Sequence, residues 1–292
     1  MTRQEFQKLC AAPVLLDGAT GSNLMAAGMP RGVCPELWIL EHPDAIHQLQ
    51  TAYVEAGSQI IYAPTFGGNR INLARYGLEE RIRELDLTLM GYAKKAAHGR
   101  ALVAGDVTTT GQFMEPLGNL TYETSFDTYR EQISLLAEGG ADLLAVETMI
   151  HIGETCAAVD AAHAVCDLPV MCSMTVEADG NIFTGGNIIE AAAQLEAAGA
   201  DAVGINCSVG PEQMEAIIHN IRKTVSVPVL AKPNAGMPII AENGQAVYQM
   251  EPEDFARHMM ALASQGATLL GGCCGTTPAF IKALAQRLSA RG

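Results

Sequence analysis

Short apolar runs recur along the chain, and amphipathic helical stretches separate them. Four of these runs follow a glycine, in EAGSQIIYAPTF, EGGADLLAVETM, AAGADAVGINCS and SQGATLLGGCCG. Glycine often ends a helix, and a short apolar run after it is typical of a buried strand. Three further runs start with Pro-Val, in APVLLDGA, LPVMCSMTV and VPVLAKPNAG, and ALVAGDVTT completes the series. The pattern therefore predicts eight strands with helical sequence between them.

The order of these elements indicates the fold class. Nearly continuous apolar strands that alternate with helices favour a parallel sheet covered by helices. Eight such units in 292 residues predict an α/β protein with a single (β/α)8 TIM barrel over residues 1–292. A doubly wound open sheet is the alternative, but it usually has fewer strands and a GxGxxG turn, which this sequence lacks. We expect the strands to begin near Val14, Ile60, Leu102, Leu143, Val170, Ala202, Val229 and Thr268.

Long segments that we expect to be non-helical follow several of the strands. They span residues 18–43, 107–122, 177–186 and 236–251. The last two contain Asp179-Gly180 and Asn243-Gly244, dipeptides that suit tight turns, and each predicts a small hairpin. Insertions after strands enlarge the rim of a barrel at which barrel enzymes carry their active sites.

Composition and charge narrow the classes of partner. The formal net charge of −14 disfavours nucleic acid and anionic membranes, because both attract clusters of Lys and Arg. The N-terminal sequence does not resemble a signal peptide, and no apolar run is long enough to predict a membrane-spanning helix. With eight cysteines and no export signal, we expect a cytoplasmic protein whose cysteines serve packing, metal binding or catalysis and do not form disulfides.

Polar or reactive residues stand at the carboxyl ends of all eight predicted strands. They are Asp17, Thr65, Asp106, Glu147, Thr175, Cys207, Asn234 and the adjacent pair Cys273 and Cys274. A closed barrel would bring these side chains to one opening. Three cysteines from strands six and eight would then form a site with three thiolates and an open fourth position, which is typical of catalytic zinc. Gly271, Gly272 and Gly275 would let the backbone bend so that both neighbouring sulfurs face one metal ion.

Other interpretations of the cysteines remain open. A buried cysteine at a strand end often serves packing alone. A redox pair is a second alternative, although the sequence has no CxxC motif. The remaining cysteines fall on predicted helices, loops or the middle of a strand: Cys10, Cys34, Cys156, Cys166 and Cys172.

Two carboxylates at strand ends predict a site for a free amino acid. Asp17 and Glu147 could cap the elements that follow them, or they could bind an ammonium group together. The N–H groups of Gly18, Ala19, Thr20 and Gly21 could hold a carboxylate in an anion nest. Asp106 and Thr65 could be purely structural. The histidines fall mainly on helices or their ends, and no Ser-His-Asp arrangement or phosphate loop is apparent.

Several stretches together resemble the homocysteine S-methyltransferases. They are LLDGATGSNLM, AGSQIIYAPTFGGNRINLARYGLEE, AVETM, GINCSVGP, KPNAGMP and GGCCGTTP. The resemblance covers nearly the whole chain and is greatest to the homocysteine-binding barrel of cobalamin-dependent methionine synthases. GINCS and GGCCGTTP at this spacing are highly specific.

The resemblance implies a set of site residues. Cys207, Cys273 and Cys274 would bind one zinc ion per chain, and Asn234 would occupy the fourth zinc position until substrate displaces it. Asp17 and Glu147 would hold the amino group of homocysteine. The backbone around Gly18, Ala19 and Thr20, with help near Thr65, would take the carboxylate. A free thiol has a pKa of about 8.5, and coordination to zinc favours the nucleophilic thiolate, so no general base on the protein is needed.

The methyl donor is inferred from what the sequence lacks. The sequence has no DxHxxG motif for cobalamin, and one barrel accounts for its length. We therefore expect a methylated corrinoid protein, or a domain of a longer protein, to supply cobalamin and the methyl group. The alternatives are S-methylmethionine, S-adenosylmethionine or betaine as donor, a different thiol as acceptor, or a non-catalytic docking subunit whose zinc is structural.

Overall fold

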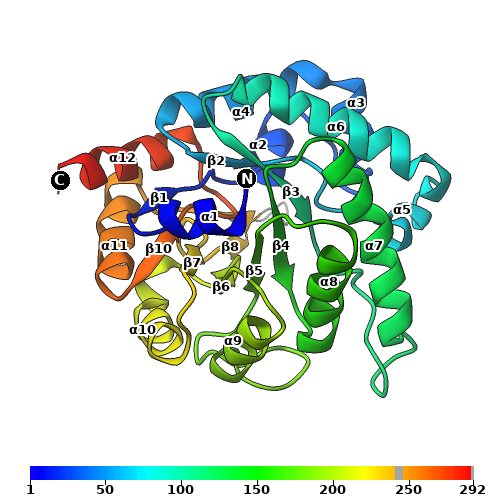
Figure 1. Cartoon of the computed structure of the whole chain (residues 1–292). Helices are drawn as coiled ribbons and strands as arrows, with labels where there is room; N and C mark the ends of the chain where they lie inside the picture. Colours follow the sequence, from blue (N-terminus) through cyan, green and yellow to red (C-terminus); the bar gives the residue numbers. More distant parts are fainter. Residues whose placement is uncertain (241–245, 291–292) are drawn as a thin grey trace.

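The computed structural model describes residues 1–240 and 246–290, and eight of its strands form one parallel sheet (Figure 1). These strands are β1 (Val14–Leu15), β2 (Ile60–Tyr62), β3 (Leu102–Val107), β4 (Leu143–Met149), β5 (Val170–Met174), β6 (Ala202–Asn206), β7 (Val229–Lys232) and β10 (Ala267–Leu270). Neighbouring strands follow the order β1-β10-β7-β6-β5-β4-β3-β2. Gln59 links the two ends of the sheet, because its N–H donates to Leu15 O at 2.7 Å and its Oε1 accepts from Leu15 N at 3.0 Å. The nearly closed ring confirms the predicted (β/α)8 barrel.

The local signals in the sequence place the strands accurately. Seven of the predicted strand starts coincide with the observed ones, and β10 begins at Ala267, one residue before the predicted Thr268. The glycines before four of the apolar runs all have positive φ, between +85° and +111°: Gly57, Gly140, Gly199 and Gly266. Glycine reaches this conformation without steric cost, which is why it ends these helices and redirects the chain into a strand.

The helices surround the strands (Figure 1). They are α1 (Arg3–Leu9), α2 (Gly21–Ala26), α3 (Pro35–Glu41), α4 (Pro43–Ala56), α5 (Arg70–Ala74), α6 (Ile82–Ala97), α7 (Tyr122–Glu138), α8 (Ile152–Val165), α9 (Ile188–Ala197), α10 (Glu215–Thr224), α11 (Pro252–Ser264) and α12 (Pro278–Ser289). Two 3-10 turns, η1 (Glu79–Arg81) and η2 (Pro211–Gln213), precede α6 and α10. A large apolar cluster fills the layer between the sheet and the outer helices.

The amino-terminal end of the barrel is closed by α1, which lies across the strands in Figure 1. Phe6 and Cys10 are buried in one apolar cluster with inward-facing strand residues such as Leu16, Ile60 and Leu230. Because side chains fill this end of the barrel, a substrate can approach the barrel axis only from the carboxyl ends of the strands.

The insertions at the carboxyl ends differ in part from the predictions. Residues 18–43 are not simply non-helical, because α2 and α3 form there and bury Leu24, Trp38 and Ile39 in a small apolar cluster. These helices have only six and seven residues, too few for a helical period to stand out in the sequence. The segment near Asp179 forms a turn with a single antiparallel bridge and no longer ladder.

The strand pair of the second predicted hairpin is present in the part of the chain that the structure describes. Strand β8 (Ile239–Ile240) pairs antiparallel with β9 (Ala246–Val247). The Asn243-Gly244 turn itself lies outside the described residues. The segment predicted as non-helical at 107–122 has Val107 at the end of β3 and Tyr122 at the start of α7. Residues 108–121 between them form no helix and carry one isolated bridge, between Met114 and Leu120.

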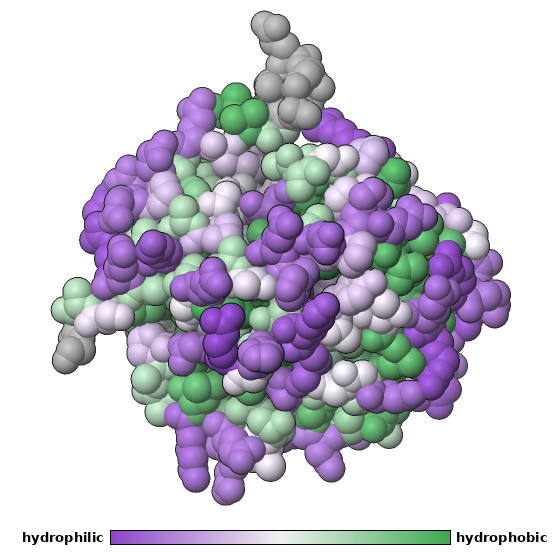
Figure 2. Space-filling view, turned by 90° about the horizontal axis from the view of Figure 1, so that it is seen from above, coloured by the Kyte–Doolittle hydropathy of each residue, from purple (hydrophilic) through white to green (hydrophobic). Residues whose placement is uncertain are grey.

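The side of the barrel that carries α4 and α6 is mainly hydrophilic (Figure 2). Figure 2 shows hydrophilic residues across the side that carries α4 and α6, with smaller hydrophobic areas between them. Over residues 1–240 and 246–290, no helix has the length and apolar character needed to cross a membrane.

Candidate active site at the carboxyl ends of the strands

Three cysteines meet at the open end of the barrel. Cys207 directly follows β6, and Cys273 and Cys274 follow β10 after two glycines. The three Sγ atoms all lie within 4.8 Å of one another, and those of Cys207 and Cys274 are 3.5 Å apart. A tetrahedral zinc ion with bonds of about 2.3 Å to sulfur requires sulfur atoms about 3.8 Å apart. The cluster therefore fits a zinc ion with small adjustments of the side chains.

The backbone of the cysteine loop is fixed by neighbouring strand ends. The Cys273 N–H donates to Pro233 O at 2.7 Å, and the Ala235 N–H donates to Cys274 O at 2.9 Å. A Cβ built on Gly272 would lie 2.4 Å from Thr276 Oγ1, so no larger residue fits there. Glycine is thus needed at position 272 for this close approach, and Gly275 supplies the predicted bend with a φ of +83°.

Strained residues support the site. Cys207 and Thr148 have φ of +51° and +58°, a conformation that costs on the order of 1–3 kcal/mol for residues other than glycine. Asn206 stabilises the second of them, because its Oδ1 accepts from the Thr148 N–H at 2.9 Å and its Nδ2 donates to Thr148 Oγ1 at 2.7 Å. The Cys207 N–H donates to Lys232 O at 3.2 Å. Thr148 at β4 is thus held by Asn206 of β6, and Cys207 is held by Lys232 of β7.

The thiols of the cluster differ in pKa. Hydrogen bonds from Cys207 and Cys273 lower the pKa of Cys274 to about 3, and Tyr248 adds a further hydrogen bond. Hydrogen bonding to Cys207 and Cys274, together with burial, raises the pKa of Cys273. The lowered pKa of Cys274 favours its thiolate form, which accepts hydrogen bonds from its neighbours. This is the donor chemistry expected of a site for a thiolate-binding cation.

Asn234 completes the surroundings of the cluster. It lies between Pro233 and Ala235, the two residues that bond to the cysteine loop. Its side chain is buried, and its Oδ1 has no hydrogen-bond partner within the described chain. A buried oxygen without a partner is costly unless a further group meets it. The oxygen is thus chemically suited to be the fourth ligand that the sequence predicts.

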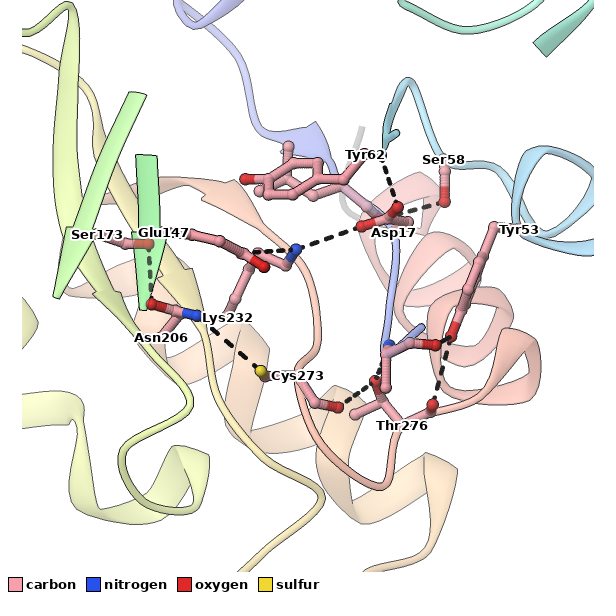
Figure 3. A network of polar contacts seen from close by, with 12 residues as sticks. Asp17, Tyr53, Ser58, Tyr62, Glu147, Ser173, Asn206, Lys232, Cys273 and Thr276 are labelled. Atoms are coloured by element: carbon pink, nitrogen blue, oxygen red, sulfur yellow. Dashed lines mark hydrogen bonds and ion pairs between the residues drawn. The ribbon is translucent and has the colours of Figure 1, made fainter. Parts of the chain in front are cut away.

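The two predicted carboxylates also meet at the barrel axis, but a lysine lies between them (Figure 3). Lys232 Nζ is 3.3 Å from Asp17 Oδ1 and 3.3 Å from Glu147 Oε2. It also lies 3.5 Å from the centroid of the Tyr62 ring. Burial by itself would lower the pKa of Lys232, but Glu147, Tyr62 and Asp17 outweigh it and raise the pKa well above its usual value.

Residues predicted near the substrate carboxylate are partly engaged within the protein. The Ala19 N–H donates to Thr276 Oγ1 at 3.1 Å, so the nest expected over residues 18–21 is partly occupied. A Cβ on Gly18 would lie 2.6 Å from Tyr53 Oη, which explains the glycine. Thr65 Oγ1 donates to Asp106 O at 2.8 Å, which favours the structural role that the sequence left open.

Asp106 and Thr175 differ from the other strand-end residues. Burial, followed by repulsion from Glu147, raises the pKa of Asp106 well above its usual value. Its Oδ1 has no partner within the described residues, so the carboxyl group is poorly suited to carry a charge. Thr175 Oγ1 donates to Asn206 O at 3.3 Å and holds the backbone before Cys207.

Sequence reasoning missed three residues of the site: Lys232, Asn206 and Tyr248. Lys232 could have been noticed, because a lysine at the end of the apolar run VPVLAK is costly to bury without partners. Asn206 directly precedes the cysteine in GINCS, but nothing local predicts that it clamps Thr148. Tyr248 reaches the cysteines from the β8–β9 segment, a contact that depends on the fold of the insertion.

Comparison with known proteins adds to this geometry. Residues 14–288 match the family model described as homocysteine S-methyltransferase. The methionine synthases of Mycobacterium tuberculosis and Mycobacterium leprae are each 32% identical over 94% of the chain, which spans 24% of their length. The homocysteine methyltransferase MmuM from Escherichia coli in its oxidized form is 25% identical, with a TM-score of 0.79 over 94% of this chain and 96% of that one. Its metallated form is 24% identical, with a TM-score of 0.78 and the same coverage.

Proposed function

Because the chain belongs to the homocysteine S-methyltransferase family, we propose that it transfers a methyl group to the thiol of homocysteine at a zinc site and so makes methionine. The observation that carries the zinc site is the cluster of Cys207, Cys273 and Cys274, whose sulfur atoms lie within 4.8 Å of one another. Asn234 has an Oδ1 that is unpartnered within the described chain, and its neighbours Pro233 and Ala235 bond to the cysteine loop, which supports a fourth position that substrate can take.

The chain's own residues prepare the thiol for reaction. Zinc held by the three cysteines would favour the thiolate form of the substrate at neutral pH. Gly275 turns the backbone with a φ of +83°, and Gly272 packs against Thr276. Asn206 and Lys232 O hold the turns that carry Thr148 and Cys207. The substrate thiol releases its proton to solvent when it ionises. The thiolate then forms its bond to the methyl carbon as the bond between that carbon and the donor breaks. No general base on the protein takes part in that step.

The amino acid end of the substrate would lie toward the barrel axis. Asp17 and Glu147 supply the negative charge that an ammonium group requires, and both are buried there. The backbone at Gly18 and Thr20 offers N–H groups for the substrate carboxylate. A free amino acid with a thiol at the end of a short side chain matches this site, because its thiol would meet the cysteine cluster while its ammonium and carboxylate groups meet the barrel axis.

We propose further that a methylated corrinoid protein, or a domain of a longer polypeptide, delivers the methyl group. The methionine synthase relatives support this choice, since the chain corresponds to only 24% of their length. The loops after the strands also expose large apolar side chains at the open end, among them Phe66, Phe113, Leu117 and Phe183. A donor protein that covers this end would remove them from water.

X-ray absorption at the zinc edge tests the site directly. The spectrum of the purified chain should show three sulfurs and one lighter atom, and L-homocysteine should convert this set to four sulfurs. Turnover with methylcobalamin, S-methylmethionine, S-adenosylmethionine and betaine would then rank the donors. Absence of zinc, or a spectrum that homocysteine does not change, would contradict the proposed site. Faster turnover with S-methylmethionine or betaine than with methylcobalamin would contradict the corrinoid donor alone.

A further inference from the structure

Asn206, the last residue of β6, lies between β4 and the cysteine cluster, and its side chain is fully buried (Figure 3). Its Oδ1 accepts from the Thr148 N–H at 2.9 Å and from Ser173 Oγ at 2.9 Å. Its Nδ2 donates to Thr148 Oγ1 at 2.7 Å and to Cys273 Sγ at 3.9 Å. A side-chain amide has two donors and two places to accept, so this one is fully engaged.

The partners of Asn206 determine which way its amide points. A backbone N–H can only donate, so the atom that meets the Thr148 N–H must be the carbonyl oxygen of the amide. The amide nitrogen is then on the other side, where one of its N–H groups points to Cys273 Sγ. Asn206 thus holds a hydrogen-bond donor, and not an acceptor, against the sulfur of a proposed zinc ligand.

Other bonds hold both partners of this contact in place. The Cys273 N–H donates to Pro233 O at 2.7 Å, and its carbonyl oxygen accepts from Thr276 Oγ1 at 2.8 Å. Asn206 is tied to β4 and β5 by the bonds to Thr148 and Ser173. The amide and the sulfur are therefore positioned by the barrel before any substrate arrives.

The proposed reaction must select one sulfur among several. When the substrate thiolate joins Cys207, Cys273 and Cys274 at one zinc position, four sulfur anions lie close to the methyl donor. The thiolate is the nucleophilic form of sulfur, so each of the four could take the methyl group. A methylated cysteine is a neutral thioether and no longer a thiolate ligand, so each such error would damage the site.

A hydrogen bond lowers the nucleophilicity of a thiolate, because the donor stabilises the charge that sulfur would share with an incoming carbon. Hydrogen bonds around a metal-bound cysteine sulfur tune metal sites in this way. We propose that Asn206 is a positioning residue that holds an N–H against Cys273 Sγ and so directs the methyl group to the substrate sulfur and away from this cysteine. This inference rests on the proposed function.

The side reaction that Asn206 suppresses can be followed with a small methyl donor. The Cys273 sulfur would form a bond to the methyl carbon with its own electron pair, as the bond from that carbon to the donor breaks and its electron pair leaves on the donor. Iodomethane reproduces this step, with iodide as the leaving group. Peptide mass spectrometry then locates each methylated cysteine, and Cys156 on α8 serves as the internal reference.

The experiment compares zinc-loaded wild type, Asn206→Asp and Asn206→Ala. Aspartate has nearly the same shape and keeps an oxygen for the Thr148 N–H, but it lacks the amide donor. We expect methylation of Cys273, relative to Cys156, to rise at least about tenfold in both variants, the effect of one hydrogen bond to a charged group. An unchanged ratio in either variant with zinc bound would overturn the proposal.

Ser173→Ala is the matched control, because it removes a partner of Asn206 Oδ1 and leaves the N–H on the sulfur. Its ratio of Cys273 to Cys156 methylation should stay within about threefold of the wild type, since its donor to sulfur is intact. A rise equal to that of Asn206→Asp would show that general loosening of the site exposes Cys273, and would overturn the proposal.

A measurement on the wild type does not depend on the folding of any variant. When an NMR-active cadmium isotope replaces zinc, a hydrogen bond to a metal-bound sulfur transmits a scalar coupling from the metal to the donated proton. One side-chain amide proton of Asn206 should show this coupling, and its absence would overturn the proposal. If homocysteine does not enter the zinc coordination of the wild type, the proposed function fails, whatever the ratio of Cys273 to Cys156 methylation.

Discussion

Cys207 is the member of the sulfur cluster that is distant in sequence from the other two. Cys207→Ser should abolish methyl transfer and lower zinc affinity at least about 100-fold, because loss of a direct ligand exceeds the 10–100-fold effect of residues that only support ligands. The barrel should remain folded, since Cys207 lies at its rim. Zinc content by mass spectrometry and circular dichroism check both points. Cys156→Ser on α8 is the matched control and should keep its zinc. Unfolding of Cys207→Ser would indicate a structural metal.

Asp86 on α6 is a buried acid outside the proposed site. Burial, with repulsion from Glu36 and Glu131, raises its pKa well above the usual value, and neither carboxylate oxygen has a hydrogen-bond partner in the described chain. The folded state therefore holds a proton that the unfolded state releases above about pH 4. Stability is lost as pH rises from there toward the folded pKa, by about 1.4 kcal/mol per pH unit.

Asp86→Asn should remove this penalty, because an amide does not ionise. We expect the difference in free energy of unfolding, variant minus wild type, to be larger at pH 8 than at pH 5. Urea unfolding at both values measures the difference. A gap between the two proteins that stays constant with pH would show that Asp86 is ionised in the folded state as well.

At the scale of elements, contact between strands β6 and β7 depends on Gly204. A Cβ at this position would lie 1.9 Å from Leu230 O, a backbone atom that cannot move without breaking the sheet. Gly204→Ala should therefore destabilise the barrel by about 3 kcal/mol or more, at the upper end of the range for overpacking.

The matched control is Gly91→Ala in α6, where a Cβ would meet no atom within 4 Å. It should stabilise the protein by about 0.5–1 kcal/mol, because alanine favours a helix interior over glycine. Thermal unfolding of both variants tests the pair. Similar melting temperatures for the two would contradict the close approach of β6 and β7.

The elements that the sequence predicted are those with local signals. Glycine caps and apolar runs mark the strands, so their starts could be located to within one residue. The sequence predicted that Cys207, Cys273 and Cys274 lie together, because a closed barrel brings the carboxyl ends of its strands to one opening. Helices α2 and α3 were missed because they are too short to show a period. The apolar run before Lys232 could have indicated a buried lysine, but its partners could not be predicted, because Asp17 and Glu147 lie far from it in the sequence.

At the scale of the whole molecule, the two ends of the barrel have different surfaces. One end is filled by α1, while the loops at the other expose apolar side chains around the cysteine site. Phe183 is 73% exposed, and its ring lies 6.4 Å from that of Phe113, so two separate loops contribute to one apolar area. Exposed apolar area of this kind often marks a protein interaction site.

Phe183→Ser should therefore slow methyl transfer from a methylated corrinoid protein. Burying a Phe side chain on docking would stabilise the complex by about 1.5–3 kcal/mol, and serine does not supply this. That corresponds to roughly a tenfold to 100-fold increase in the KM for the donor protein. Free methylcobalamin has no protein surface that docks at Phe183, so the variant and the wild type should use it equally well. Steady-state rates with both donors measure the effect. An equal loss with free methylcobalamin would place Phe183 in the reaction site itself, and no loss with either donor would move the docking surface away from this part of the rim.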